Sequence, residues 1–167
     1  IHLLSADERG KTNVKPEDLW IDIGATSREE AEQRVEVGDY ITYSTVPQML
    51  TEDVVLSKSL DDRAGVFVLY EMARLLANET LACDLYLVAS VQEEIGCRGV
   101  RTAAFALQPQ MGIAIDVTHA TDYPTVTPKK SGNIELGKGV VIAKGPNIDR
   151  ELCEQLKHAA TSAELPY

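Results

Sequence analysis

The residues most able to do chemistry in this chain are carboxylates that lie beside apolar segments. Glu93 and Glu94 come shortly after an almost unbroken apolar run, residues 85–91, and Asp61 and Asp116 lie in equally apolar surroundings. An uncompensated buried charge is costly and is normally neutralised by a pKa shift. Three unpaired carboxylates about 4 Å apart would repel by about 4 kcal/mol per pair at an effective dielectric constant of about 20. A divalent cation reverses the sign of this interaction, so the sequence predicts a metal site.

Glu93 and Glu94 are expected to have different roles. Neighbouring residues in an extended segment point to opposite sides, so the two side chains cannot both chelate one ion. One then binds the metal and the other stays free. A divalent ion lowers the pKa of a water molecule towards neutrality, and a free carboxylate beside it can take the proton. This pattern predicts metal-assisted hydrolysis.

A simpler interpretation treats the same acids as ordinary surface and helix-start residues. Asp61 or Asp62 would cap a helix, Glu93 and Glu94 would be solvated, and Asp116 would lie in a turn. Each cluster by itself favours this interpretation. Only their joint placement at the ends of apolar segments favours a functional site.

The histidines decide which metal the site could prefer. Oxygen ligands alone suit Mg²⁺ or Ca²⁺, whereas Zn²⁺ or Co²⁺ normally also needs imidazole. The chain has three histidines, His2, His119 and His158. His119 follows Asp116 by three residues, and we expect it in a loop or behind the ligands rather than on the metal. The chain by itself is short of nitrogen ligands.

Composition excludes several classes of function. The 167 residues carry a net charge of -10, and the basic residues form no stripe that could follow a phosphate backbone, so a nucleic-acid partner is not expected. No segment approaches a membrane-spanning apolar length. The odd number of cysteines, three, fits a reducing cytoplasm. We expect Cys97 to be a small buried thiol without a chemical role.

Residues 1–52 differ in character from the rest and predict a small β-rich module. Residues 19–23 and 40–43 have the β-branched and aromatic content of strands. Between them, Ser27 and Glu30 are spaced as a capping box that opens a short helix reaching about residue 35.

Residues 53–167 alternate between strand and helix patterns and predict a partial catalytic α/β domain. This alternation favours a mainly parallel sheet with helices on both faces. The predicted strands are residues 85–91, 111–117 and 140–143, and the predicted helices are residues 62–78, 99–107 and 149–163. Ligands bind outside the carboxyl ends of the strands in such sheets, which is where Glu93, Glu94 and Asp116 fall.

Several motifs in this order resemble the M42 family of metallo-aminopeptidases, the glutamyl aminopeptidase and TET group. The resemblance extends over nearly all 167 residues. Its motifs are Leu60-Asp61-Asp62-Arg63-Ala64-Gly65, Gln92-Glu93-Glu94-Ile95-Gly96 with Arg98-Gly99, Ala114-Ile115-Asp116-Val117-Thr118-His119, Leu136-Gly137-Lys138-Gly139, Asp22-Ile23-Gly24-Ala25 and Val37-Gly38-Asp39.

The resemblance implies a zinc-peptidase-like fold and a site for two divalent metal ions, zinc or cobalt. Asp61 would bridge both ions, Glu94 would bind one and Asp116 the other, with Glu93 as the general base. The implied reaction removes N-terminal residues from peptides in the cytoplasm. A related metal-dependent deacylase or carboxypeptidase remains the nearest alternative.

The resemblance also concerns the surroundings of the site. Asp62 and Arg63 would be supporting residues, and the peptide bond between Asp61 and Asp62 is expected to be cis. The β-rich module resembles the part of the family that makes dimer contacts, and dimers commonly assemble into dodecamers. A non-catalytic assembly fragment is therefore a further alternative.

One part of the family pattern has no match in this chain. The family completes its site with two histidines, one before the β-rich module and one beyond the position of Tyr167. Since neither is found here, the chain is expected to be an internal piece of a longer enzyme. By itself it should bind metal poorly and should not catalyse.

Overall fold

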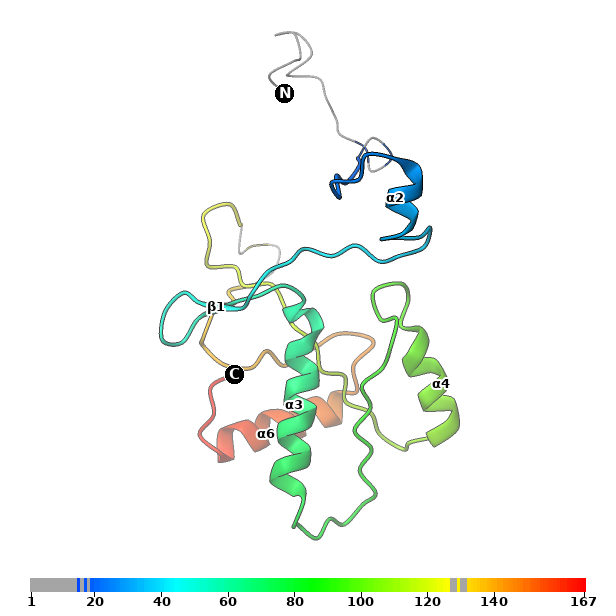
Figure 1. Ribbon diagram of the computed structural model, residues 1–167. Helices are drawn as coiled ribbons and strands as arrows, with labels where there is room; N and C mark the ends of the chain where they lie inside the picture. The colour runs from blue at the N-terminus through cyan, green and yellow to red at the C-terminus, as the bar shows by residue number, and fades with distance from the viewer. Residues whose placement is uncertain (1–14, 16, 18, 127–128, 130–131) are drawn as a thin grey trace. The chain divides into compact units, whose positions relative to one another are not determined.

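The computed structural model describes residues 15, 17, 19–126, 129 and 132–167 (Figure 1). The chain divides into two compact units, Ile1–Ser44 and Thr45–Tyr167. The predicted domain boundary after residue 52 falls inside the second unit, between the two strands of its hairpin. Each unit is described by itself below.

The first unit is organised around helix α2, Arg28–Glu32. Ser27 is its N-cap, and its hydroxyl accepts a hydrogen bond from the Glu30 backbone N–H at 3.2 Å, as the capping-box pattern predicted. The Glu30 carboxylate does not return to Ser27. It accepts hydrogen bonds from the backbone N–H and the hydroxyl of Thr26, both at 3.0 Å.

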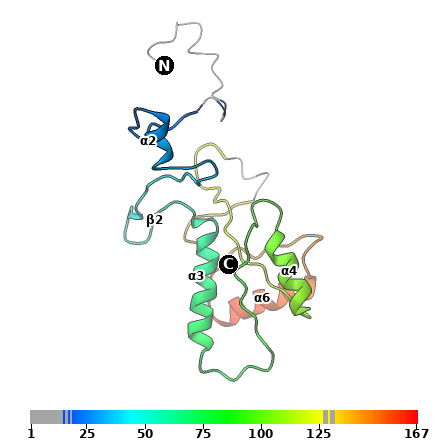
Figure 2. The ribbon, with the colours of Figure 1, turned by 45° about the vertical axis from the view of Figure 1, so that its right-hand side comes forward.

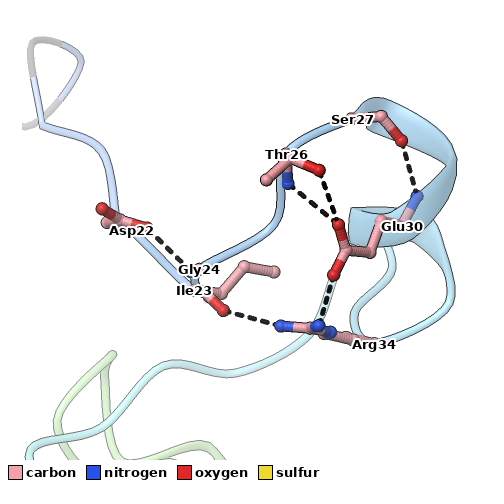
Figure 3. Close-up of polar contacts among 7 residues, drawn as sticks. All are labelled: Asp22, Ile23, Gly24, Thr26, Ser27, Glu30 and Arg34. Carbon is pink, nitrogen blue, oxygen red and sulfur yellow. Dashed lines mark hydrogen bonds and ion pairs between the residues drawn. The ribbon is translucent and has the colours of Figure 1, made fainter.

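Arg34 connects α2 to the chain that precedes it (Figure 3). Its guanidinium donates to the carbonyl oxygen of Ile23 at 2.9 Å and pairs with Glu30. A turn at Gly24, where φ is +70°, is closed by a hydrogen bond from the Gly24 N–H to Asp22 Oδ1 at 2.8 Å. Residues 19–23 and 40–43 are irregular in the structure, so the β-rich character of this module stays a prediction.

The second unit begins with a short antiparallel hairpin (Figure 2). Strand β1, Gln48–Met49, pairs with β2, Val55–Leu56, so that Gln48 is opposite Leu56 and Met49 is opposite Val55. The Leu50 N–H donates to the Val54 carbonyl at 2.7 Å and closes the turn. These are the strands found in the described part of the chain.

Three helices follow in the described residues, close to the predicted positions. They are α3, Leu60–Leu76, α4, Arg98–Leu107, and α6, Arg150–Ser162. The backbone of Asp61 and Asp62 is not helical, so regular α3 begins after them. Asp149 caps α6 by accepting a hydrogen bond from the Leu152 N–H at 2.8 Å. No helix in the described residues is both long and apolar enough to cross a membrane.

The predicted parallel sheet stays a prediction. Residues 85–91, 111–117 and 140–143 run as irregular chain between the helices. In the described part of the chain, only Gly65, Thr121 and Cys153 are buried. Apolar side chains of the first predicted strand are exposed, with 44% of Leu85 and 68% of Val91 accessible. Apolar strands of this kind are stabilised by elements on both faces, and the described residues do not supply that cover.

Thr121 is a buried polar residue whose backbone and side chain are both hydrogen-bonded. Its N–H donates to the Ile134 carbonyl at 2.7 Å, and its hydroxyl accepts from the Ile134 N–H at 2.8 Å. The same hydroxyl lies 3.1 Å from the Gly132 carbonyl oxygen, to which it can donate. Next to it, Asp122 accepts from the Leu136 N–H at 3.0 Å. The segment after Asp116 is thereby joined to residues 132–136.

Candidate metal and catalytic site

The Asp61-Asp62 segment enters α3 through an unusual backbone. The peptide bond between Asp61 and Asp62 is cis, which confirms the expectation from the family resemblance. Asp62 Oδ1 accepts a hydrogen bond from the Gly65 N–H at 2.8 Å, so Asp62 serves the start of the helix. A Cβ atom at position 65 would collide with this carboxylate, so a larger residue there would displace the Asp62 side chain. Asp61 makes no such bond to the helix start.

The segment that carries Glu93 and Glu94 is folded into a tight loop before α4. The N–H groups of Gly96 and Cys97 both donate to the Glu93 carbonyl at 2.8 Å. The Gly99 N–H donates to the Val91 carbonyl at 2.9 Å, and a Cβ atom on Gly99 would collide with the Val91 backbone. Three residues of the loop, Gln92, Gly96 and Cys97, have φ of 60°, 114° and 52°.

Three acidic residues, Asp61, Glu93 and Asp116, act electrostatically on the carboxylate of Glu94. The pKa of Glu94 is raised above its ordinary value, and the largest cause is the negative charge of Asp61. The charge of Glu93, partial loss of hydration and the charge of Asp116 add to this effect in that order. Asp61 and Asp116 are far from Glu94 in the sequence, so the fold has brought these like charges together. Such an arrangement favours a bound cation.

These carboxylates influence Glu94 electrostatically, but they are not arranged as a set of metal ligands. Among the described residues, no three Asp, Glu, His or Cys side chains are grouped closely enough to hold one ion. One oxygen of Asp116 is already used, because it accepts a hydrogen bond from the Val117 N–H at 2.7 Å. Three carboxylates that repel one another suit divalent cations in charge and donor type, although nitrogen ligands are lacking among them.

The histidines and Arg63 contribute little to this geometry. His119 is exposed and belongs to no metal-binding group in the described part of the chain. His158 lies on α6, where its Nδ1 is 3.1 Å from the Ser162 hydroxyl. His2 lies outside the described residues. Arg63 donates its backbone N–H to the Ser59 carbonyl at 3.3 Å, within the entry to α3.

The exposure of Cys97 contradicts one prediction from the sequence. It was expected to be a buried thiol, yet it is exposed at the N-cap of α4. The expectation was wrong because Cys97 lies in an exposed loop at the start of α4, and the described residues place no apolar cover over it. Instead, its thiol donates a hydrogen bond to Glu93 Oε1 at 3.3 Å. Only the spacing of four residues around a glycine hinted at this contact in the sequence.

Two cavities of the second unit lie away from the acidic residues of the candidate site, Asp61, Glu93, Glu94 and Asp116. One is lined by Lys144, Gly145, Ile148, Arg150 and Cys153. Another lies between residues 110–112 and the start of α6. The acidic residues of the candidate site line neither cavity, and each of them is exposed or half-buried.

Comparisons with known proteins agree with the sequence motifs. A family model described as M42 glutamyl aminopeptidase matches residues 1–167. A lysyl aminopeptidase of Pyrococcus furiosus is 40% identical over 163 residues, which cover 96% of this chain and 44% of that protein. A putative aminopeptidase of Acetivibrio thermocellus is 35% identical over 93% of this chain and 46% of its own length. The putative aminopeptidase SgcX of Escherichia coli is 36% identical over 83% of this chain and 37% of its own. The chain thus spans less than half the length of these relatives.

Proposed function

Because the chain belongs to the M42 glutamyl aminopeptidase family, we propose that the whole protein is a metal-dependent aminopeptidase that removes N-terminal residues from peptides. The observation that carries this proposal is the joint action of Asp61, Glu93 and Asp116 on the pKa of Glu94. Family membership gives the reaction class, and the clustered charge gives a place where that reaction could occur.

Asp61, Glu94 and Asp116 would hold two divalent ions, zinc or cobalt. Their mutual repulsion is what a cation would relieve, and this supports the assignment. Bound ions of this kind polarise a carbonyl and make water acidic enough to lose a proton near neutral pH. Imidazole ligands would have to come from His119 or from parts of the protein outside these 167 residues. The isolated chain should therefore bind metal weakly and lack activity.

Glu93 is the proposed general base. It precedes Glu94 directly, and the loop of residues 91–99 fixes its backbone through hydrogen bonds to its carbonyl. Its carboxylate would take a proton from the attacking water and deliver that proton to the leaving amine. Asp62 would support this site indirectly, since it holds the start of α3 beside Asp61.

The substrates, the oligomeric state and the cellular compartment of the enzyme are also proposed. Peptides are the expected substrates, and the relative named lysyl aminopeptidase makes an N-terminal lysine the first residue to test. We expect a homo-oligomer, with the β-rich module of residues 1–52 contributing to dimer contacts and dimers assembling to a dodecamer. The protein is expected in the cytoplasm, where thiols stay reduced, because its three cysteines are free.

The decisive experiment uses the full-length protein with matched peptides that differ only in N-terminal acetylation. An aminopeptidase cleaves the free peptide and loses activity on the blocked one. Equal activity on both would contradict the proposal and favour the deacylase or carboxypeptidase alternative. Chelation should remove activity, added Zn²⁺ or Co²⁺ should restore it, and Glu93→Gln should lower kcat by at least about 100-fold. A protein that is inactive in every arm would favour an assembly role.

A further inference from the structure

We propose that Cys97 is a positioning residue, which holds the Glu93 carboxylate through a thiol hydrogen bond. The inference rests on the proposed role of Glu93 as general base. It starts from the contact of 3.3 Å between Cys97 Sγ and Glu93 Oε1, which lies within the range of a sulfur hydrogen bond. A general base acts well only when its oxygen is held towards the proton that it must take.

The local backbone is built to produce this contact. Cys97 is the N-cap of α4, a position whose side chain commonly caps the helix, but its thiol makes no capping bond. The positive φ of Gly96 and of Cys97 reverses the chain, and the Cys97 N–H donates to the Glu93 carbonyl. Backbone and side chain of Cys97 thus both face Glu93, which leaves the two residues joined at two points.

The electrostatic surroundings place Cys97 in the same region as the acidic residues. The pKa of its thiol is raised, first by the hydrogen bond to Glu93 and then by partial loss of hydration, with a smaller contribution from Asp116. Arg101 acts in the opposite direction. The thiol therefore stays protonated at neutral pH and keeps the hydrogen that it donates. A thiolate would repel the carboxylate instead of holding it.

Three variants of the full-length protein test the positioning role by activity. Cys97→Ala removes the donor and should lower kcat about three- to tenfold with little change in KM, and should alter the acidic limb of the pH profile. Cys97→Ser keeps a donor on the same atom position and should restore most of this loss. Cys83→Ser, at another exposed cysteine, is the matched control and should behave as the parent. Equal loss in the alanine and serine variants, or no loss in either, would overturn the proposal.

A second measurement does not need activity. Among the three cysteines of these 167 residues, Cys97 is the one that stays exposed in the Cys83→Ser background, since Cys153 is buried. Its alkylation is therefore followed by mass spectrometry of the peptide that carries it. The pH dependence of its alkylation by iodoacetamide reports the thiol pKa, which Glu93→Gln should lower. An unchanged profile would show that the contact is absent. If the full-length protein has no peptidase activity but this shift is found, the contact stands and it is the general-base role that fails.

Discussion

The negative charge of Asp61 is the largest cause of the raised pKa of Glu94. Asp61 lies at the entry to α3, and Glu94 lies in the loop before α4. The two carboxylates therefore repel each other although they come from separate elements. A bound cation would relieve this repulsion, which is the basis of the proposed metal site.

We predict that Asp61→Asn lowers the pKa of Glu94 more than Asp116→Asn does. The reason is the order of the causes, in which Asp61 comes first and Asp116 last. Carboxyl-carbon NMR of the metal-free protein, recorded across acidic pH, measures both shifts. An equal shift in the two variants would contradict this order of the causes.

The same repulsion fixes the sign of a pH effect on stability. The pKa of Glu94 in the folded protein lies above its ordinary value of 4.5. The folded state therefore binds this proton more tightly than the unfolded state does. Its contribution to the free energy of unfolding is fully present below pH 4.5 and is lost as pH rises through the folded pKa. Asp61→Asn should flatten this part of the profile of the metal-free protein, measured by urea denaturation at a series of pH values.

The helices could be predicted from the sequence because their signals are local. Ser27 and Asp149 cap helices whose first turns follow directly, and α4 ends at the predicted residue. The strands could not be tested in the same way, because a strand depends on distant partners that stabilise it. Residues 85–91 are apolar enough for a covered strand, yet the described residues leave much of their surface exposed.

The candidate site was partly predictable for a related reason. Its acidic residues stand out by type, since carboxylates next to apolar runs are unusual. Their convergence on Glu94 needed the fold. The contact from Cys97 to Glu93 depends on three positive φ angles in one loop. Of the three residues, only Gly96 is of a type whose presence predicts a positive φ.

Asp61 and Asp62 form a natural matched pair for testing the metal site. The two side chains are chemically identical, but only Asp62 accepts the Gly65 N–H. In the full-length protein, Asp61→Ala should lower the bound metal and the kcat by at least about 100-fold. Asp62→Ala should retain most of the metal and lower the free energy of unfolding by about 1 kcal/mol, as the loss of a helix cap does. Metal content by atomic spectroscopy and thermal melts separate the two effects, and the reverse pattern would exchange the proposed roles.

Thr121→Val should destabilise the protein by about 1–3 kcal/mol. Thr121 is only 5% exposed, and valine would keep its shape while leaving the Ile134 N–H without its acceptor. The control is Thr80→Val, because Thr80 is exposed in the chain after α3. Urea denaturation compares the two variants with the parent. A loss of similar size in both would mean that the hydrogen bonds joining Thr121 to residues 132–136 contribute nothing.

The 167-residue chain, expressed alone, should expose apolar surface to solution. In the described residues Trp20 is 95% exposed, Phe105 82% and Phe67 62%, while the buried side chains are few. Apolar surface of this extent binds hydrophobic dyes and promotes association. We therefore expect strong ANS fluorescence and concentration-dependent association by light scattering, both of which should be far weaker for the full-length protein at equal molarity. A monomeric chain with weak dye binding and a sharp cooperative melt would mean instead that these 167 residues form a closed core by themselves.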